Sequence, residues 1–385
     1  MAVRQTCILY ADEMANQSKA FKNFLRGISS LATKSDYTQY LKNFMSFHKF
    51  GDHFDELVKS STEKIDDLIS DYLDSMMKRG VKGITQRAHL MGIERLFIMN
   101  DCIWHKERIR RGIKKDDEIP GGNVPITTEE ISLMLDCTKS IRSKALIHFL
   151  ASTGIRPAGL TDPILKIKHL TPMNNPSDPR NKKWCYAVKV YDESKSGYWS
   201  FLTPEATNLL DHFIQSRKLN GEKITDESPI FITIKKTNTL NQHLTDDNAR
   251  FIIYNLIKQS GLIRKKISKS RYDKSMMYMF RKRFNTILKL NNEVNSNIAE
   301  KLMAHKKGLD GVYLQPTQEE CYKEFIKAIP QLTVDDSERK QVELDKLSKE
   351  KSELAAKNEK LEIALKKVDE LWADKQRMEH VALDD

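Results

Sequence analysis

The sequence predicts a mainly α protein (α+β) with a small β-hairpin sheet and a long C-terminal helix. Three observations support this fold class. Apolar residues recur at helical spacing through most of the chain, most clearly in residues 62–80. Residues 184–202 form two alternating stretches around a short polar turn, which is typical of a hairpin. Residues 336–380 repeat apolar positions in heptads, as a coiled coil does.

Length and composition restrict the class of protein further. A chain of 385 residues exceeds the roughly 250–300 residues at which single cores stop growing, so two or three domains are expected. No apolar run approaches the roughly 20 residues of a membrane span, and the N-terminus lacks a signal-peptide pattern. The 5 cysteines contain no CxxC pair, which argues against a disulfide framework or a metal site and favours the cytoplasm.

The net charge is the most informative bulk property. A charge of +11 and a pI near 9.2 favour a polyanionic partner, of which nucleic acid is the commonest. The alternative is a basic soluble protein without such a partner.

The first part of the chain predicts a helical domain over residues 16–113. Residues 1–15 give no firm signal and are treated as an N-terminal extension. Helices are expected over 36–50, from the cap at Ser61 or Thr62 to Gly80, and again after Gly83. Their methionine and phenylalanine stripes are interpreted as core.

A basic run followed by glycine and proline predicts an interdomain linker over residues 114–125. In a DNA-binding protein such cations would lie along phosphates, although a basic linker is usually just solvated. The cations predicted to contact DNA here are Lys106, Arg108, Arg110, Arg111, Lys114 and Lys115.

The second domain, residues 126–335, begins with a predicted capping box between Thr127 and Glu130. A helix over 143–156 is expected to end at Gly154. The hairpin follows, and Thr203 with Pro204 then begins another helix.

The rest of the second domain is predicted from weaker signals. Residues 228–234 form a short ambiguous strand, and Thr245 caps a further helix. Residues 264–275 are expected to be a basic loop, and 321–332 a last apolar helix that a neighbouring subunit receives.

Four segments carry residue types suited to attack on a phosphodiester. That reaction needs an in-line nucleophile, cations on the non-bridging oxygens, an acid for the leaving oxygen and a base. Arginine binds phosphate bidentately, and tyrosine can store the bond energy as a phosphotyrosine. The segments are STGIRPAGL (152–160), DESKSGYWSFL (192–202), MYMFRKRF (277–284) and LMAHKKGLDGVY (302–313).

With these segments in this order, the chain resembles the tyrosine recombinase (phage integrase) family, most closely its archaeal integrase-like members. The resemblance covers residues 15–335. It implies a helical, SAM-like core-binding domain that binds double-stranded DNA, followed by a mixed helical catalytic domain. It also implies a site-specific recombinase or integrase of a mobile element, which forms a 3′-phosphotyrosyl intermediate, needs no metal, ATP or other cofactor, and assembles as a tetramer on paired DNA sites.

The resemblance also implies a role for each matching residue. Arg156 and Arg281 match the two arginines that grip the scissile phosphate. Lys195, in the hairpin turn, matches the lysine that protonates the leaving 5′ oxygen. His305 matches the histidine that hydrogen-bonds the phosphate, and Tyr313 matches the nucleophile.

The sequence departs from the family pattern at three positions. Tyr278 stands where the family usually has histidine, and tyrosine is a poor base at neutral pH. Gly159 stands where an acidic residue often lies, and Ala304 replaces the usual glycine before His305. Three further cations are expected to contact DNA: Lys265, Lys266 and Lys282.

The tail predicts self-association through a coiled coil. Its apolar a and d positions are Leu344, Leu347, Leu354, Leu361, Leu365 and Val368. Asn358 at an a position favours a parallel pair of helices. The alternative is a single amphipathic helix folded back on its own domain.

Two other functions remain open at this point. A type IB topoisomerase shares the chemistry, but its coiled coil typically precedes the nucleophile, whereas here it follows Tyr313. A catalytically decayed, recombinase-derived DNA-binding protein would account for Tyr278 and Gly159. For an active recombinase, a location in the cytoplasm with the nucleoid is expected.

Overall fold

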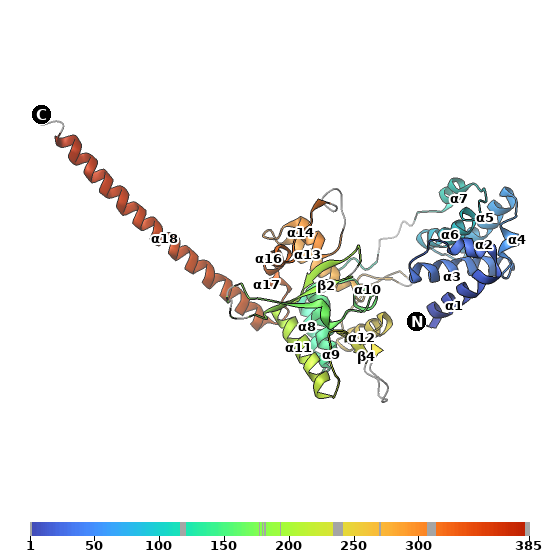
Figure 1. Cartoon of the computed structure of the whole chain (residues 1–385), viewed down its shortest axis with the longest axis horizontal. Coiled ribbons are helices and arrows are strands. Elements are labelled where there is room, and N and C mark those ends of the chain that lie inside the picture. Colours follow the sequence, from blue (N-terminus) through green and yellow to red (C-terminus); the bar gives the residue numbers. More distant parts are fainter. Residues whose placement is uncertain are drawn as a thin grey trace. The chain divides into compact units, whose positions relative to one another are not determined.

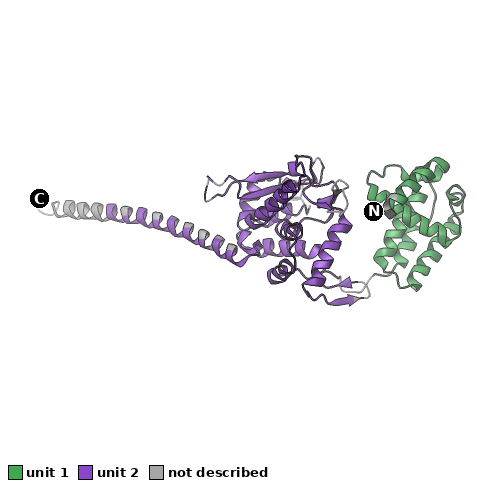
Figure 2. Ribbon diagram, turned by 90° about the horizontal axis from the view of Figure 1, so that it is seen from below, with its two compact units in different colours: residues 1–119 green, residues 120–385 purple. Residues whose placement is uncertain are grey.

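The computed structural model describes residues 2–115, 121–176, 178, 180, 182–192, 194–233, 242–268, 271–305 and 313–381. The chain divides into two compact units, Met1–Ile119 and Pro120–Asp385 (Figure 2). Helices dominate both units, and the strands lie in the second (Figure 1). Among the described helices, none is long and apolar enough to cross a membrane.

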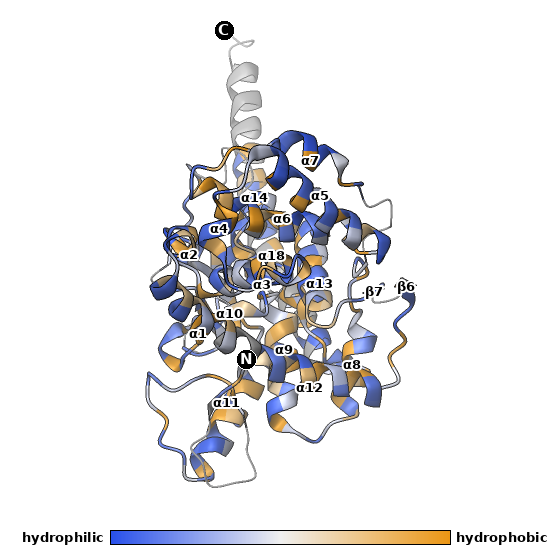
Figure 3. Ribbon diagram, turned by 90° about the vertical axis from the view of Figure 1, so that its right-hand side faces the viewer, coloured by the Kyte–Doolittle hydropathy of each residue, from blue (hydrophilic) through white to orange (hydrophobic). Residues whose placement is uncertain are grey.

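The first unit is a helical bundle. Ser18, Ser30 and Ser61 each cap a helix by accepting a backbone N–H, and the cap at Ser61 confirms the predicted start. Figure 3 shows hydrophilic and hydrophobic residues alternating along helices such as α5, as expected for helices with one face in a core. The helices are α1 (Ala2–Gln17), α2 (Lys19–Leu25), α3 (Leu31–Phe47), α4 (Phe54–Leu57), α5 (Thr62–Lys78), α6 (Gly83–Ile98) and α7 (Lys106–Gly112).

Both ends of this unit are more ordered than the sequence suggested. Instead of an extension, the first residues form α1, whose Ala11 and Met14 are buried in the bundle core. The basic run forms α7, with Ile109 and Ile113 buried in the same core. Residues 116–120 of the predicted linker lie outside the described residues.

The second unit surrounds a small sheet with helices. The capping box of Thr127 and Glu130, the end of α9 at Gly154 and the cap at Thr245 are confirmed. Its main helices are α8 (Thr128–Asp136), α9 (Ile141–Thr153), α10 (Ala158–Thr161), α11 (Pro204–Leu219), α12 (Asp246–Gln259), α13 (Tyr278–Leu290), α14 (Ser296–Leu302), α16 (Gln318–Ile326), α17 (Ile329–Leu332) and α18 (Asp336–Val381).

The predicted hairpin is confirmed as β2 (Cys185–Val190) paired antiparallel with β3 (Tyr198–Phe201). A further strand, β1 (Leu170–Met173), pairs with the other edge of β2 and gave no alternating signal in the sequence. Val188 and Val190 pack into the core that contains α9, while Cys185 and Ala187 pack into the core that contains α16. The central strand is therefore buried on both faces.

Three predicted segments differ in the structure. The basic loop is a second hairpin, β6 (Lys266–Ser268) with β7 (Arg271–Tyr272), and residues 269–270 between the strands lie outside the described residues. The ambiguous strand is reduced to β4 (Ile232–Thr233), paired with β5 (Gln242–His243). The expected last helix is two helices, α16 and α17. Their apolar residues are buried in the unit's own core, and exchange of this segment with a neighbouring subunit stays a prediction.

Candidate active site

The end of α9 builds the first wall of the site. Gly154 ends the helix with φ +55°, a left-handed conformation that disfavours any side chain. A Cβ at Gly154 would lie 2.6 Å from ring atoms of Phe284 on α13. Glycine therefore lets the chain turn and lets α13 approach closely, which positions Arg156 just beyond the helix.

Arg281 comes from the first turns of α13 and is 6% exposed. Its Nη1 donates to the carbonyl of Gly154 at 2.8 Å, and its Nη2 donates to that of Met303 at 2.6 Å. The same Nη2 lies 3.0 Å from Nε2 of His305. A guanidinium carries five N–H donors, so these bonds fix the group and still leave donors for an anion.

Arg156 lies next to this group and forms with it what we call the arginine pair. Burial, and then the charge of Arg156, lower the pKa of Arg281. Arg156 itself makes one long hydrogen bond, from Nη2 to the carbonyl of Ala304 at 3.5 Å. Within the described part of the chain, neither guanidinium has a carboxylate partner. Two close, partly desolvated cations without a counter-ion are the arrangement expected of an anion-binding site.

His305 is held between the arginine pair and an acid. Its Nδ1 lies 2.6 Å from Oε2 of Glu300, which also pairs with Lys289 at 2.8 Å. Because Arg281 can only donate, Nε2 of His305 must accept and Nδ1 must carry the proton that Glu300 accepts. Burial lowers the pKa of His305, which favours this neutral form, although the bond to Glu300 opposes the shift.

Glu300 was missed by sequence reasoning. Burial alone would raise its pKa, but hydrogen bonds from Lys289 and His305 lower it to about 2. The carboxylate is thus ionised at neutral pH and orients the imidazole. An acid five residues before a histidine, across a helix end, is too common a spacing to have indicated this role.

Ala304 adopts a left-handed conformation with φ +52°. The family's usual glycine at this position accepts such a backbone freely, whereas alanine is strained there. The turn nevertheless points the carbonyls of Met303 and Ala304 at Arg281 and Arg156. The departure at Ala304 therefore leaves the geometry of the arginine pair intact.

The departure at Gly159 has a steric cause. Gly159 is buried in α10, where a Cβ would lie 2.7 Å from Cγ1 of Ile155 and 3.1 Å from Cγ1 of Val190. An aspartate or glutamate does not fit there without moving both neighbours. The site accordingly lacks an acid at this position for packing reasons.

Two tyrosines beside the arginine pair were also missed. Tyr198 is buried at the start of β3, and burial raises its pKa to about 12. Arg281 acts on its hydroxyl and lowers the pKa, against the larger effect of burial. Tyr191 is half-buried, and burial raises its pKa too. The sequence signal for Tyr198 was its place in the alternating pattern of the second hairpin strand, which predicts a side chain that faces the core.

The remaining predicted residues are less tightly placed. Lys195 is exposed on the turn between β2 and β3. Tyr278 begins α13 and is 45% exposed, and Tyr313 is 78% exposed. No hydrogen bond joins the hydroxyl of Tyr313 to a residue that the structure describes. Residues 306–312, which precede Tyr313, lie outside the described residues.

The cations predicted to contact DNA differ in the partners that they have within the fold. Three of those on α7 form ion pairs inside the first unit: Lys106 and Arg110 with Glu94, and Arg108 with Asp66. Lys282 donates to Oδ1 of Asn123 at 2.8 Å. The other five, like Arg108 and Arg110, are exposed: Arg111, Lys114, Lys115, Lys265 and Lys266.

No protein-family model matches the sequence, and no curated protein does either. Solved structures match it in fold. One is the XerH site-specific recombinase bound to palindromic difH substrate in a post-cleavage complex, with a TM-score of 0.50 and 18% identity over 79% of this chain and 83% of that one. Another is a fragment of the Tn1549 transposon integrase in complex with circular intermediate DNA, with a TM-score of 0.50 and 18% identity over 83% of this chain and 98% of that one.

This chain has the tyrosine recombinase fold. The match covers 83% of the chain, and it confirms the mainly α class with a small antiparallel sheet. In this fold Arg156 follows the end of α9, and Lys195 lies in the turn after β2. Arg281 comes from the start of α13, and His305 lies three residues beyond the end of α14. Among the residues that the structure describes, no three His, Cys, Asp or Glu side chains gather as metal ligands would.

Proposed function

We propose that this protein is a site-specific DNA recombinase that breaks and rejoins DNA strands through a covalent bond between Tyr313 and a 3′ phosphate. The observation that carries the proposal is the arginine pair. Arg156 and Arg281 converge without a carboxylate, with His305 fixed beside them, in a chain of net charge +11. A phosphodiester supplies the missing negative charge.

In the proposed reaction, the free N–H groups of the arginine pair bind the non-bridging oxygens of the scissile phosphate. The hydroxyl oxygen of Tyr313 attacks phosphorus, and the bond from phosphorus to the 5′ oxygen breaks. Lys195 gives its proton to that leaving oxygen. Neutral His305 accepts the tyrosine proton at Nε2, and the N–H formed there then donates a hydrogen bond to the phosphate.

Rejoining is the same sequence reversed, with a 5′ hydroxyl from the partner strand as nucleophile. Because the bond energy is stored in the phosphotyrosine, no cofactor is required by this chemistry. Tyr313 is exposed, so the proposal requires its segment to close on the arginine pair when DNA is bound. Tyr278 replaces the family's usual histidine as an orienting group rather than as a base.

We also propose a homo-oligomer that assembles on DNA through α18. Its apolar a and d residues, Leu344 to Val368, are 49% to 61% exposed, so their own unit does not cover them. Such a stripe is stable in water when a second copy of the helix covers it. A tetramer on paired DNA sites and the archaeal, mobile-element affiliation stay predictions of the sequence, as does a location in the cytoplasm with the nucleoid.

The test is to trap the covalent adduct. The protein is mixed with a fragment library of DNA from its source organism in buffer containing a chelator, and the reaction is quenched with detergent. Adducts that survive denaturation, cluster at few sequences and vanish with Tyr313→Phe are expected. Adducts spread over all sequences would instead indicate a topoisomerase. DNA binding without any adduct would indicate a decayed, DNA-binding protein.

A further inference from the structure

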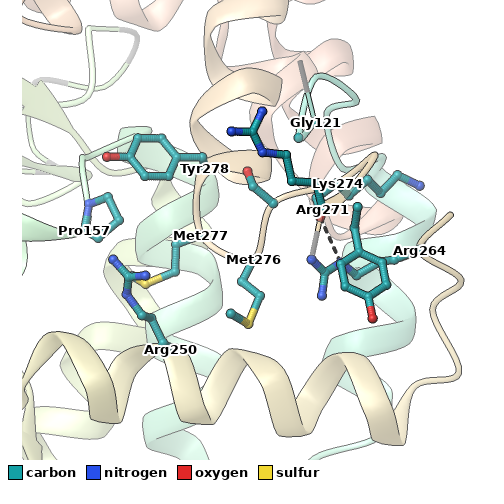
Figure 4. Close-up of a pocket in the computed structure, with 12 residues that line it drawn as sticks. Gly121, Pro157, Arg250, Arg264, Arg271, Lys274, Met276, Met277 and Tyr278 are labelled. Carbon is teal, nitrogen blue, oxygen red and sulfur yellow. Dashed lines mark hydrogen bonds between the residues drawn. The ribbon is translucent and has the colours of Figure 1, made fainter. Parts of the chain in front are cut away.

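A pocket of about 300 Å³ opens beside the candidate active site (Figure 4). It has two links to that site, because Pro157 follows Arg156 and Tyr278 precedes Arg281 by one helical turn. Both residues line the pocket. None of the roles proposed above uses this space, which we call the basic pocket.

Four cations line the basic pocket, and no acidic residue is among its lining residues. Two of the four are neutralised from outside the pocket: Arg250 pairs with Asp246 at 2.8 Å, and Lys274 pairs with Glu130. The other two, Arg264 and Arg271, have no carboxylate partner within the described part of the chain. The pocket therefore carries uncompensated positive charge.

The two uncompensated arginines are held on the hairpin of β6 and β7. The guanidinium of Arg264 lies 4.3 Å from the ring centroid of Tyr272, and its Nε donates to the carbonyl of Lys274 at 2.8 Å. The nearest acid on this hairpin, Asp273, accepts the backbone N–H groups of Lys265 at 2.9 Å and Lys274 at 2.7 Å. Its carboxylate thus holds the backbone turn, and its charge offsets part of the positive charge of Arg264.

Gly121 and Gly122 pack directly against this hairpin and leave no room for a side chain. A Cβ at Gly121 would lie 2.8 Å from Cβ of Arg271, and one at Gly122 would lie 3.0 Å from Cβ of Ser275. Gly122 also donates its N–H to the carbonyl of Tyr272 at 2.6 Å. Nearby, the buried hydroxyl of Ser275 has no hydrogen-bond partner among the described residues. An acceptor in the pocket would satisfy it.

We propose that the basic pocket binds a second phosphate of the DNA strand that the arginine pair holds, with Arg264 and Arg271 as its cations and Met276 against the sugar. This inference rests on the proposed function. Phosphates of one strand follow each other about every 3.4 Å along the axis of B-DNA. A strand with its scissile phosphate on Arg156 and Arg281 passes directly over Tyr278 to the pocket.

The binding geometry gives Tyr278 a positioning role. It stands between the arginine pair and the basic pocket, so its exposed ring separates two neighbouring phosphates. The substitution of tyrosine for the family's usual histidine then has a use in holding the strand, even though tyrosine is a poor base.

The experiment measures the salt dependence of DNA affinity in the Tyr313→Phe background, so that cleavage does not intervene. The probe is a fluorescein-labelled duplex of random sequence, and the dissociation constant is measured over a range of NaCl concentrations. Arg271→Gln is expected to weaken binding several-fold and to reduce the slope of log Kd against log [NaCl] by about 0.9, the value for one lost phosphate contact. Arg271→Lys keeps the charge and should restore most of the slope.

The matched control is Lys218→Gln, which removes an exposed cation in the last turn of α11, outside the pocket. Its slope should equal that of the parent, and all variants should keep the parent's melting temperature. If the slope of log Kd against log [NaCl] is unchanged in Arg271→Gln, or is reduced equally in Lys218→Gln, the basic pocket does not bind a phosphate. The proposed function would still stand. A parent protein that does not bind the duplex would overturn both.

Discussion

The cations of α7 and those of the arginine pair differ in how their charge is balanced. On α7, Arg108 and Arg110 reach the carboxylates of Asp66 and Glu94, which are 2% and 7% exposed. In the second unit, Arg281 is 6% exposed, and within the described chain it hydrogen-bonds two carbonyls and His305 and has no carboxylate partner. Charge on α7 is used within the fold, because a buried acid needs a partner. Charge at the arginine pair remains available for an outside anion.

The same contrast appears within α13. Arg283 is 4% exposed, and its guanidinium donates to the carbonyls of Gln331 and Leu332 and to the hydroxyl of Thr128. It therefore fastens α13 to α17 and to the start of α8. Arg281, two residues earlier, uses similar bonds to hold a guanidinium beside Arg156. Arg283 thus fixes the packing of α13, whereas Arg281 lies beside a second guanidinium.

The largest expected effect comes from changing the shape of one cation. Arg281→Lys keeps the charge but removes the planar fork, so adduct formation should slow by about 10²–10³-fold, as when one transition-state donor is lost. The rate is measured by single-turnover trapping in detergent. Arg108→Lys, the matched change on α7, should leave this rate unchanged. Equal rates for Arg281→Lys and the native protein would contradict the view that the arginine pair, unlike the cations of α7, binds the DNA phosphate.

The next largest effect is expected from Gly154, whose close contact with Phe284 positions Arg156. Gly154→Ala combines a left-handed backbone with a clash against Phe284, and should lower the free energy of unfolding by at least about 3 kcal/mol. Gly221→Ala is the control, because Gly221 has φ +85° but nothing within 4 Å of a Cβ. Gly221→Ala should lower the free energy of unfolding by about 1 kcal/mol, from backbone strain alone. Urea denaturation measures both, and equal losses would show that the contact with Phe284 is unimportant.

Acid should weaken the second unit through Glu300. Its pKa is lowered from 4.5 to about 2, so its stabilising contribution is present above pH 4.5 and is lost as pH falls toward 2. The native protein should therefore lose more unfolding free energy across this window than Glu300→Gln does. Thermal unfolding at several pH values measures this. Parallel curves for the two proteins would mean that the bonds to Lys289 and His305 contribute nothing.

The smallest expected effect concerns the strained residue before His305. Ala304→Gly should raise the free energy of unfolding by about 1 kcal/mol, because glycine adopts the left-handed backbone without strain. It should leave the rate of adduct formation unchanged, since the carbonyls at 303 and 304 keep their directions. A destabilised Ala304→Gly protein would show that the turn is not strained.

Local signals in the sequence predicted much of the fold. The capping box at Thr127, the helix end at Gly154 and the hairpin of β2 and β3 each depend on neighbouring residues, and each is confirmed. Strand β1 was missed because its partner β2 lies well beyond it in the sequence. The hairpin of β6 and β7 was missed because strands of 3 and 2 residues are too short to show an alternating pattern.

Part of the candidate site, like part of the fold, was predictable from the sequence. Arg156, Arg281 and His305 were identified from motifs, and the structure brings these three together. Glu300 and Tyr198 were missed because their roles depend on contacts between elements rather than on spacing. The roles of Lys195 and Tyr313 stay predictions, because both side chains are exposed in the described chain.

The most direct test of the central claim is to identify the residue that carries the DNA. Adducts trapped on the DNA sites found by library cleavage are digested with nuclease and protease, and the modified peptide is sequenced by mass spectrometry. We predict a nucleotide attached through a 3′ phosphate to the hydroxyl of Tyr313. Attachment to Tyr278 or to any other residue would contradict the proposed mechanism.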